Sequence, residues 1–199
     1  MITMFKKTAA AVIASFVFAA SAHAGLIDVS SIVITKSAGI DYNIQLTEVQ
    51  AFQTGTGTNV ALDSNGGVAS APNQWNLDSG PGKANDGQSA NMNFPNMYHS
   101  RGLAATDYLS ITLAAATELS SFTLFGRSDC CSDRDIFDVS FFSVAGDLLH
   151  KQLNVNATGA THSATFALPN TNVPEPASIA LLGLSLAGLM ATRRKRSAK

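Results

Sequence analysis

Short runs of alternating apolar and polar residues recur between residues 31 and 168. A period of two places every second side chain on the same face of a strand, so these runs predict strands with one buried face. The strictest example is residues 107–113, where every second position from 109 is apolar. The pattern predicts strands at residues 31–35, 44–52, 59–62, 107–113, 119–125, 136–144, 148–155 and 164–168.

Turn-forming residues separate the predicted strands. Gly146-Asp147 supplies a hairpin-type turn, and residues 53–58 and 64–67 are rich in Gly, Thr, Ser and Asn. The alternation within residues 44–52 changes phase, which indicates a strand with a bulge. This region contains no amphipathic helical pattern and no internal repeat. Several short strands joined by turns predict an all-β fold, a β-sandwich or jelly roll.

The longest interruption of the strand pattern covers residues 70–100, which are dense in Asn, Gly, Pro and Ser. Such a composition predicts no helix. A loop of this length inside a compact domain usually serves a function or is held by an ion. We therefore expect binding residues within it.

The first 24 residues have the layout of a secretory signal peptide. Lys6 and Lys7 form a basic start, residues 9–20 are apolar, and Ala22-His23-Ala24 supplies small residues for cleavage after Ala24. The apolar part is too short and alanine-rich for a spanning helix. We expect the protein to be exported.

Residues 173–199 form a second distinct segment. Pro174-Glu175-Pro176 is followed by an apolar run at 177–191 and by basic residues at 193–196. A helix over the apolar run would be roughly 22 Å long, short of a hydrocarbon core of about 30 Å, so it predicts a marginal transmembrane helix. The basic cluster would remain cytoplasmic. An ordinary C-terminal anchor is the alternative.

This tail resembles the PEP-CTERM sorting signal of Gram-negative bacteria, because all three parts occur in order. The resemblance implies recognition by an exosortase and cleavage near Pro174, Glu175 and Pro176. It also implies a transient inner-membrane anchor, followed by delivery to the cell surface or the extracellular matrix.

Residues 25–172 remain as one domain, long enough to bury a single core without disulfide staples. They contain 6 basic and 13 acidic residues, a net charge of −7. An acidic surface repels phosphate backbones, so we expect no nucleic-acid partner. The acidic residues are scattered and Gly-x-Ser-x-Gly is absent, so we expect no enzyme activity.

Residues 126–135 hold both cysteines and two of the few arginines of this domain. They follow a predicted strand, and strand-end loops often carry sites. Arg127 and Arg134 flank Asp129, and two rigid guanidinium groups beside a carboxylate suit a ligand rich in oxygen acceptors. The simpler interpretation is a surface ion pair of little energetic value.

Cys130 and Cys131 are adjacent, which leaves a vicinal disulfide, two free thiols or an intermolecular link as alternatives. Their Cα atoms lie about 3.8 Å apart, below the usual disulfide range, so a vicinal bond needs a distorted peptide. Such a bond closes almost no loop. Its value would be local, as a flat apolar ledge suited to the C–H face of a monosaccharide.

Arg127-x-Asp129-Cys130-Cys131-x-x-Arg134 resembles the signature of F-type lectins, the fucose-binding branch of the discoidin-like β-sandwiches. That family has a histidine a little under thirty positions upstream, and His99 stands 28 positions before Arg127. The resemblance implies that His99, Arg127 and Arg134 bind the hydroxyls and ring oxygen of fucose. Asp129 would orient the arginines, and Cys130–Cys131 would pack on the sugar ring.

The segment Lys83–Gln88 resembles the loop in which F-type lectins bind calcium. The resemblance implies a Ca²⁺ site with the Asp86 carboxylate and the backbone carbonyls of Lys83 and Gln88. Glu48 would add a carboxylate and Thr47 a carbonyl, which gives an all-oxygen set suited to a hard cation. The alternative is that Asp86-Gly87 only forms a turn.

The segment that contains Glu48 departs from the family, because it stands at the start of the domain instead of its end. We interpret this order as a circular permutation of the discoidin-like (galactose-binding-like) sandwich, which neighbouring termini permit. The family's serine just before its histidine is not clearly matched, and Asn96 is the nearest candidate.

The leading hypothesis is a surface lectin for fucose or a related 6-deoxy or galacto-configured sugar. The alternative is a structural protein of the matrix or biofilm that binds no sugar. A protein- or lipid-binding discoidin module is weaker, since its loops carry few apolar residues beyond Met92, Phe94 and Met97. The sequence specifies neither the natural glycan nor the oligomeric state.

Overall fold

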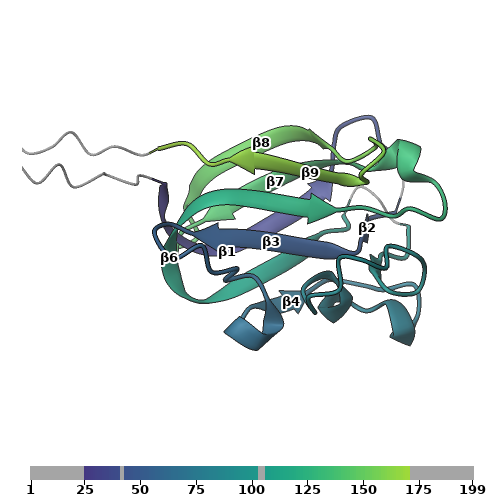
Figure 1. Ribbon diagram of the computed structural model, residues 1–199, viewed down its shortest axis with the longest axis horizontal. Helices are drawn as coiled ribbons and strands as arrows, with labels where there is room; N and C mark the ends of the chain where they lie inside the picture. Colours follow the sequence, from purple (N-terminus) through teal and green to yellow (C-terminus); the bar gives the residue numbers. More distant parts are fainter. Residues whose placement is uncertain (1–24, 41–42, 103–105, 171–199) are drawn as a thin grey trace, which may run out of the picture.

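The computed structural model describes residues 25–40, 43–102 and 106–170, and its regular structure is almost wholly antiparallel β (Figure 1). The predicted signal peptide and sorting signal lie outside these residues. No helix within these ranges is long and apolar enough to cross a membrane. The strands are β1 (Leu26–Lys36), β2 (Gln45–Leu46), β3 (Glu48–Gln53), β4 (Val68–Ser70), β5 (Tyr98–His99), β6 (Leu109–Phe125), β7 (Ile136–Phe142), β8 (Leu148–Asn156) and β9 (Ser163–Ala167).

Short 3₁₀ helices interrupt the connections between these strands. The described ranges contain η1 (Asp63–Asn65), η2 (Leu77–Ser79), η3 (Pro81–Ala84) and η4 (Ser132–Arg134). The predicted all-β class is confirmed.

Among the described residues, seven strands form one antiparallel sheet and two form a small separate sheet. The large sheet has the order β3-β6-β1-β7-β8, and β4 and β9 also pair with β6, whereas β2 pairs with β5. In the centre, Ile32 of β1 lies opposite Ile111 of β6 and Phe141 of β7. All three side chains are fully buried, as expected for aligned positions on one face of a sheet.

The long strand β6 connects two layers. Residues 109–112 pair with β1 and β4, whereas residues 119–125 pair with β3 and β9. Figure 1 shows β6 reversing at one end of the molecule, so that both of its ends lie toward the opposite end, among the loops. The Phe122 ring of β6 meets the Phe141 ring of β7 edge to face at 5.6 Å between centres. The two layers therefore pack through aromatic side chains across a shared core.

The sandwich or jelly-roll form of this all-β fold stays a prediction. The discoidin-like type of sandwich and the circular permutation stay predictions. Both ends of the coloured ribbon in Figure 1 lie at the end of the molecule where β6 reverses, away from the loops at the other end.

Three strand predictions are corrected by the structure. Residues 107–113 and 119–125 belong to one strand, because the residues between them remain extended while β6 bends. The strand predicted at 44–52 is divided at Thr47 into β2 and β3, where the alternation changes phase.

The strand predicted at residues 59–62 is wrong. Only a single bridge joins Asn59 to Phe52, and the Asn59 side chain accepts hydrogen bonds from the backbone N–H groups of Ala51 and Ala61. A side chain that bonds to nearby backbone competes with strand pairing.

β1 begins at Leu26, earlier than predicted. Register shifts between Leu26 and Ser31 disturb the alternation there, which hid this part of the strand from periodicity.

Candidate functional site

The loop of residues 126–135 begins directly after β6 and leads into β7. Gly126 is needed at its start, because a Cβ atom there would collide with the carboxylate of Asp135. Asp135 Oδ2 accepts a hydrogen bond from the backbone N–H of Arg127 at 2.9 Å. One buried carboxylate therefore holds the two ends of the loop together.

Lys36, the last residue of β1, is buried under this loop. Its Nζ donates to the carbonyl oxygen of Arg134 at 2.7 Å and lies 3.4 Å from Asp135 Oδ1. It also lies 4.2 Å from the centre of the Phe137 ring, a favourable position for a cation. Lys36 is bonded to the backbone of Arg134, and Asp135 is bonded to the backbone of Arg127. The buried pair therefore restrains the backbone at both arginines.

Burial governs the ionisation of this pair. Desolvation lowers the pKa of Lys36 to about 8, although the charge of Asp135 opposes the change. Desolvation also raises the pKa of Asp135 above its usual range. For both groups the loss of water outweighs their mutual attraction, as is common for buried ion pairs.

Arg127 is oriented by Asp129. Its Nε donates to Asp129 Oδ1 at 2.6 Å and its Nη2 to Oδ2 at 3.1 Å, a bidentate arrangement. These hydrogen bonds hold the pKa of the Asp129 carboxyl below its usual value. The guanidinium lies over the Phe94 ring, 5.5 Å from its centre. Asp129 uses only part of the guanidinium, so further N–H groups can serve a ligand.

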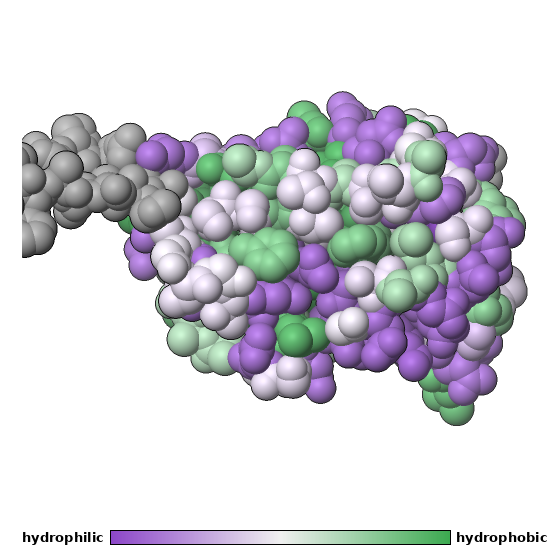
Figure 2. Space-filling model, in the orientation of Figure 1, coloured by the Kyte–Doolittle hydropathy of each residue, from purple (hydrophilic) through white to green (hydrophobic). Residues whose placement is uncertain are grey.

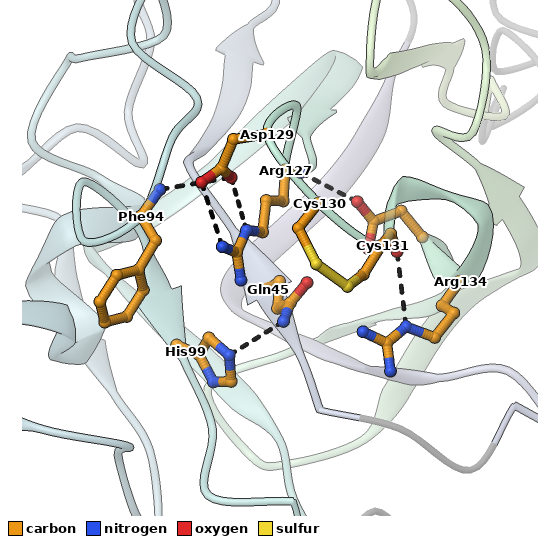
Figure 3. Close-up of a disulfide and its surroundings, with 9 residues drawn as sticks. Gln45, Phe94, His99, Arg127, Asp129, Cys130, Cys131 and Arg134 are labelled. Atoms are coloured by element: carbon orange, nitrogen blue, oxygen red, sulfur yellow. Dashed lines mark hydrogen bonds and ion pairs between the residues drawn. A yellow bond between two sulfur atoms is a disulfide. The ribbon is translucent and has the colours of Figure 1, made fainter.

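Cys130 and Cys131 form a vicinal disulfide, one of the three thiol states that the sequence allowed. Cys131 has a left-handed backbone with φ of 61°, after which η4 brings Arg134 back toward the loop. Arg134 Nε lies 3.5 Å from the carbonyl oxygen of Cys131. Figure 3 shows the guanidinium groups of Arg127 and Arg134 on either side of the disulfide.

His99 lies in β5 and is fixed by a hydrogen bond at each ring nitrogen. Nδ1 lies 2.7 Å from the carbonyl oxygen of Ser100, and Nε2 lies 2.9 Å from Nε2 of Gln45. A carbonyl can only accept, so Nδ1 carries the proton and Nε2 accepts from the Gln45 amide. Burial lowers the pKa of His99, and the positive charges of Arg127 and Arg134 add to this effect. The imidazole is therefore neutral.

Gln45 belongs to β2 and lies opposite His99 across the small sheet. Figure 3 shows its amide between the histidine ring and the disulfide. The sequence analysis missed this residue, because the pairing of two two-residue strands leaves no periodic signal. Lys36 and Asp135 were missed for a similar reason, since they are 99 positions apart.

Aromatic rings extend the site beyond His99. The Phe94 ring contacts His99 edge to face at 5.9 Å between centres, and the Trp75 ring lies 5.3 Å away. Both come from the 70–100 loop, which was predicted to carry binding residues. The wall next to Arg127 therefore consists of Phe94, His99 and Trp75.

Glu48 begins β3 and lies beside the predicted calcium loop. Its Oε2 accepts a hydrogen bond from the backbone N–H of Gly87 at 3.0 Å. Oε1 is buried and has no hydrogen-bond partner among the described residues. Burial raises the pKa of Glu48 to about 7, and the negative charge of Asp86 adds to the shift. A buried carboxylate oxygen without a partner, close to a second acid, fits a bound cation.

The other predicted ligands in the calcium loop also lie close together. Asp86 Oδ1 accepts from the backbone N–H of Gln88 at 3.0 Å, and Oδ2 lies 3.7 Å from Nζ of Lys83. Within the described ranges, no group of three or more His, Cys, Asp or Glu side chains could hold a metal. A cation here would need backbone carbonyls as well.

Thr47 connects this region to the arginine loop. Its hydroxyl donates to the carbonyl oxygen of Gly126 at 2.7 Å. Its backbone N–H donates to the carbonyl oxygen of Phe125 at 2.8 Å. The residue before Glu48 is thus bonded to the first residues of the loop that carries Arg127. The two candidate regions share one framework.

Comparison with known proteins identifies the tail but not the domain. The PEP-CTERM protein-sorting motif matches residues 172–196, which confirms the predicted sorting signal. No F-type lectin family matches the chain. No curated protein matches it either, and no solved structure does. The motif indicates an exported protein that an exosortase processes and that is sorted to the cell surface.

Proposed function

We propose that this exported protein is a surface or matrix lectin of a Gram-negative bacterium that binds fucose or a related sugar. The observation that carries the proposal is the group of two guanidiniums, a neutral histidine and a vicinal disulfide around one position (Figure 3). Guanidinium N–H groups suit hydroxyl and ring oxygens, and the disulfide offers an apolar surface to a C–H face. Aromatic rings beside polar donors complete a typical small-ligand site.

Each residue has a distinct part in the proposed complex. Arg127, oriented by Asp129, and Arg134 donate hydrogen bonds to hydroxyl groups. His99 positions Gln45, whose amide stands between the ring and the disulfide and can itself meet the sugar. Because these groups are held before binding, the ligand orders few side chains and loses less affinity to entropy.

Calcium fits the second region and has a structural part in the proposal. Glu48 and Asp86 would hold the ion together with the backbone carbonyls of Lys83, Gln88 and Thr47. The ion would neutralise the buried Glu48 carboxylate. Thr47 bonds to Gly126, so ordering of the calcium loop would be transmitted to the arginine loop.

Calorimetric titration of the full-length chain with L-fucose and galactose tests the proposal, first in calcium and then in chelator. We expect saturable fucose binding that is lost in Arg127→Ala, with a loss of at least tenfold because a charged donor contributes about 1.5–3 kcal/mol. Arg101→Ala, which removes an exposed arginine outside the group, is the matched control and should bind normally.

A flat titration of the folded wild-type chain would exclude simple sugar binding. The structural-matrix hypothesis would then be preferred. Weaker binding in chelator would support the cation site, whereas equal binding in both buffers would remove calcium from the proposal.

A further inference from the structure

Trp75 is exposed but rigidly held beside the proposed sugar site. It is the only tryptophan of the chain, and 57 % of its surface is accessible. Most large aromatic side chains bury the greater part of their surface, so an ordered and exposed indole suggests a contact surface. On the face drawn in Figure 2, the apolar surface is divided into separate patches among hydrophilic residues.

The backbone around Trp75 is fixed by several long-range hydrogen bonds. Its N–H donates to the carbonyl oxygen of His99 at 2.7 Å. Two residues earlier, Asn73 accepts from the hydroxyl of Tyr98 at 3.0 Å and from the backbone N–H of Arg101 at 2.7 Å. The Asn73 amide also donates to the buried Asp107. Residues 73 and 75 are thus hydrogen-bonded to residues 98–101, the segment that carries His99.

The Trp75 ring is continuous with the candidate site. Its centre lies 5.3 Å from that of His99, and Phe94 contacts the same imidazole. Arg127 lies over Phe94, so the aromatic wall leads outward from the arginines to the indole. A ligand longer than one ring would extend over this wall.

We propose that Trp75 forms a second subsite, which stacks on the sugar that follows fucose in a fucosylated oligosaccharide. This inference rests on the proposed lectin function and adds that the preferred ligand is at least a disaccharide. The C–H face of a pyranose ring packs on the exposed indole, as apolar groups do on aromatic faces. The indole is already ordered, so stacking requires little further immobilisation.

Leu77 shows why a sugar is favoured over a membrane or an apolar partner. It is 92 % exposed and also belongs to the 70–100 loop, yet it has no place in the ring contacts of Trp75, His99 and Phe94. The apolar surface that continues the site is aromatic and flat. Leu77→Ala is therefore a matched control for Trp75→Ala.

Trp75 is the only tryptophan of the chain, so the intrinsic tryptophan fluorescence reports on this position alone. The full-length chain is titrated with L-fucose and with fucosyl disaccharides linked to galactose or N-acetylglucosamine, and both emission and affinity are recorded. We expect at least one disaccharide to shift or quench the Trp75 emission and to bind about 2- to 10-fold more tightly than fucose. Trp75→Ala should lose this preference and bind that disaccharide no more tightly than it binds fucose. Leu77→Ala should behave as wild type.

Equal binding of fucose and every disaccharide by the wild-type chain would overturn the subsite and leave the lectin proposal standing. An unchanged disaccharide preference in Trp75→Ala would overturn it as well. If the wild-type chain binds neither fucose nor any disaccharide, both proposals fail together. A shift of the Trp75 emission on phospholipid vesicles, without a response to any sugar, would assign this surface to membranes and would also overturn the inference.

Discussion

His99 shows how much a single side-chain partner changes the chemistry of a residue. Its Nδ1 donates to Ser100, its Nε2 accepts from Gln45, and both bonds stabilise one neutral tautomer. The resemblance implies His99 as a direct ligand, but both of its ring nitrogens already form hydrogen bonds within the fold. Gln45 thereby becomes part of the candidate site.

We predict that His99 titrates below its usual value, because burial and the nearby arginines lower its pKa. Fucose affinity should therefore change little between pH 8 and 7, where the imidazole stays neutral. Heteronuclear NMR of the imidazole nitrogens measures the midpoint and the tautomer. In Gln45→Ala the midpoint should rise, since the donor that occupies Nε2 is removed. A wild-type midpoint at or above 6.5 would contradict the prediction.

Glu48 makes the folded state sensitive to pH. Its pKa is about 7 in the folded chain and 4.5 ordinarily, so the folded chain keeps a proton that the unfolded chain loses. Without metal, the free energy of unfolding should fall as pH rises from about 4.5 to 7. Calcium should reverse this fall and bind more tightly at higher pH, because it competes with the proton.

Denaturation of wild type and Glu48→Gln in chelator and in calcium measures this effect. The glutamine variant removes the buried charge, so it should be more stable than wild type in chelator at pH 8. It should also lose the response to calcium. A stability that is equally pH-dependent in both proteins would show that another group is responsible.

At the level of elements, the candidate site lies where several strand ends meet. β6 ends before the arginine loop, β1 ends at Lys36, and β7 starts after Asp135. The loop itself contains little regular structure, so the neighbouring strands hold its shape through Lys36 and Asp135. This arrangement places the site on a loop that rigid strands support.

We predict that Lys36→Met lowers the free energy of unfolding by about 3–5 kcal/mol, because it leaves the Asp135 carboxylate buried without its cation. The loss should be larger at pH 7 than at pH 4.5, where more of the Asp135 carboxyl is protonated. Denaturant titrations at both pH values measure it. The double variant Lys36→Met/Asp135→Asn should recover most of the stability, since no buried charge remains. A loss below about 1 kcal/mol in the single variant would mean that the pair is solvated.

On the scale of the whole molecule, the site and the chain ends lie at opposite ends of the fold. The described chain stops at residue 170, at the end where β6 reverses, and the sorting motif begins at residue 172. The arginine loop therefore lies away from the end of the domain at which the chain continues toward this motif. Sorting and binding should therefore be separable.

We predict that replacing Pro174, Glu175 and Pro176 by alanine leaves an uncleaved precursor in the membrane fraction, because the exosortase no longer recognises it. Fractionation and mass spectrometry of the mature chain distinguish the two forms. Arg127→Ala should be processed and sorted as wild type. Normal surface delivery of the triple variant would assign sorting to another signal.

The sequence by itself determined what local patterns can encode. Alternation gave the all-β class and most strand positions, and the tail carries its sorting address in consecutive residues, as the motif match confirms. The arginines and cysteines of residues 126–135 were identified as candidates because they are adjacent in the chain. Their sugar-binding role stays a prediction.

Only the tertiary structure decided which distant groups meet. β6 is one bent strand and Lys36 lies under Arg134, with no local signal for either arrangement. The position of Glu48 beside Gly87 was expected only from a family resemblance, not from any periodicity. The physical reason is that periodicity specifies which face of a strand is buried but not its neighbours. Strand order and the packing of the layers select those neighbours. The buried partners in turn set the charges and orientations of the site.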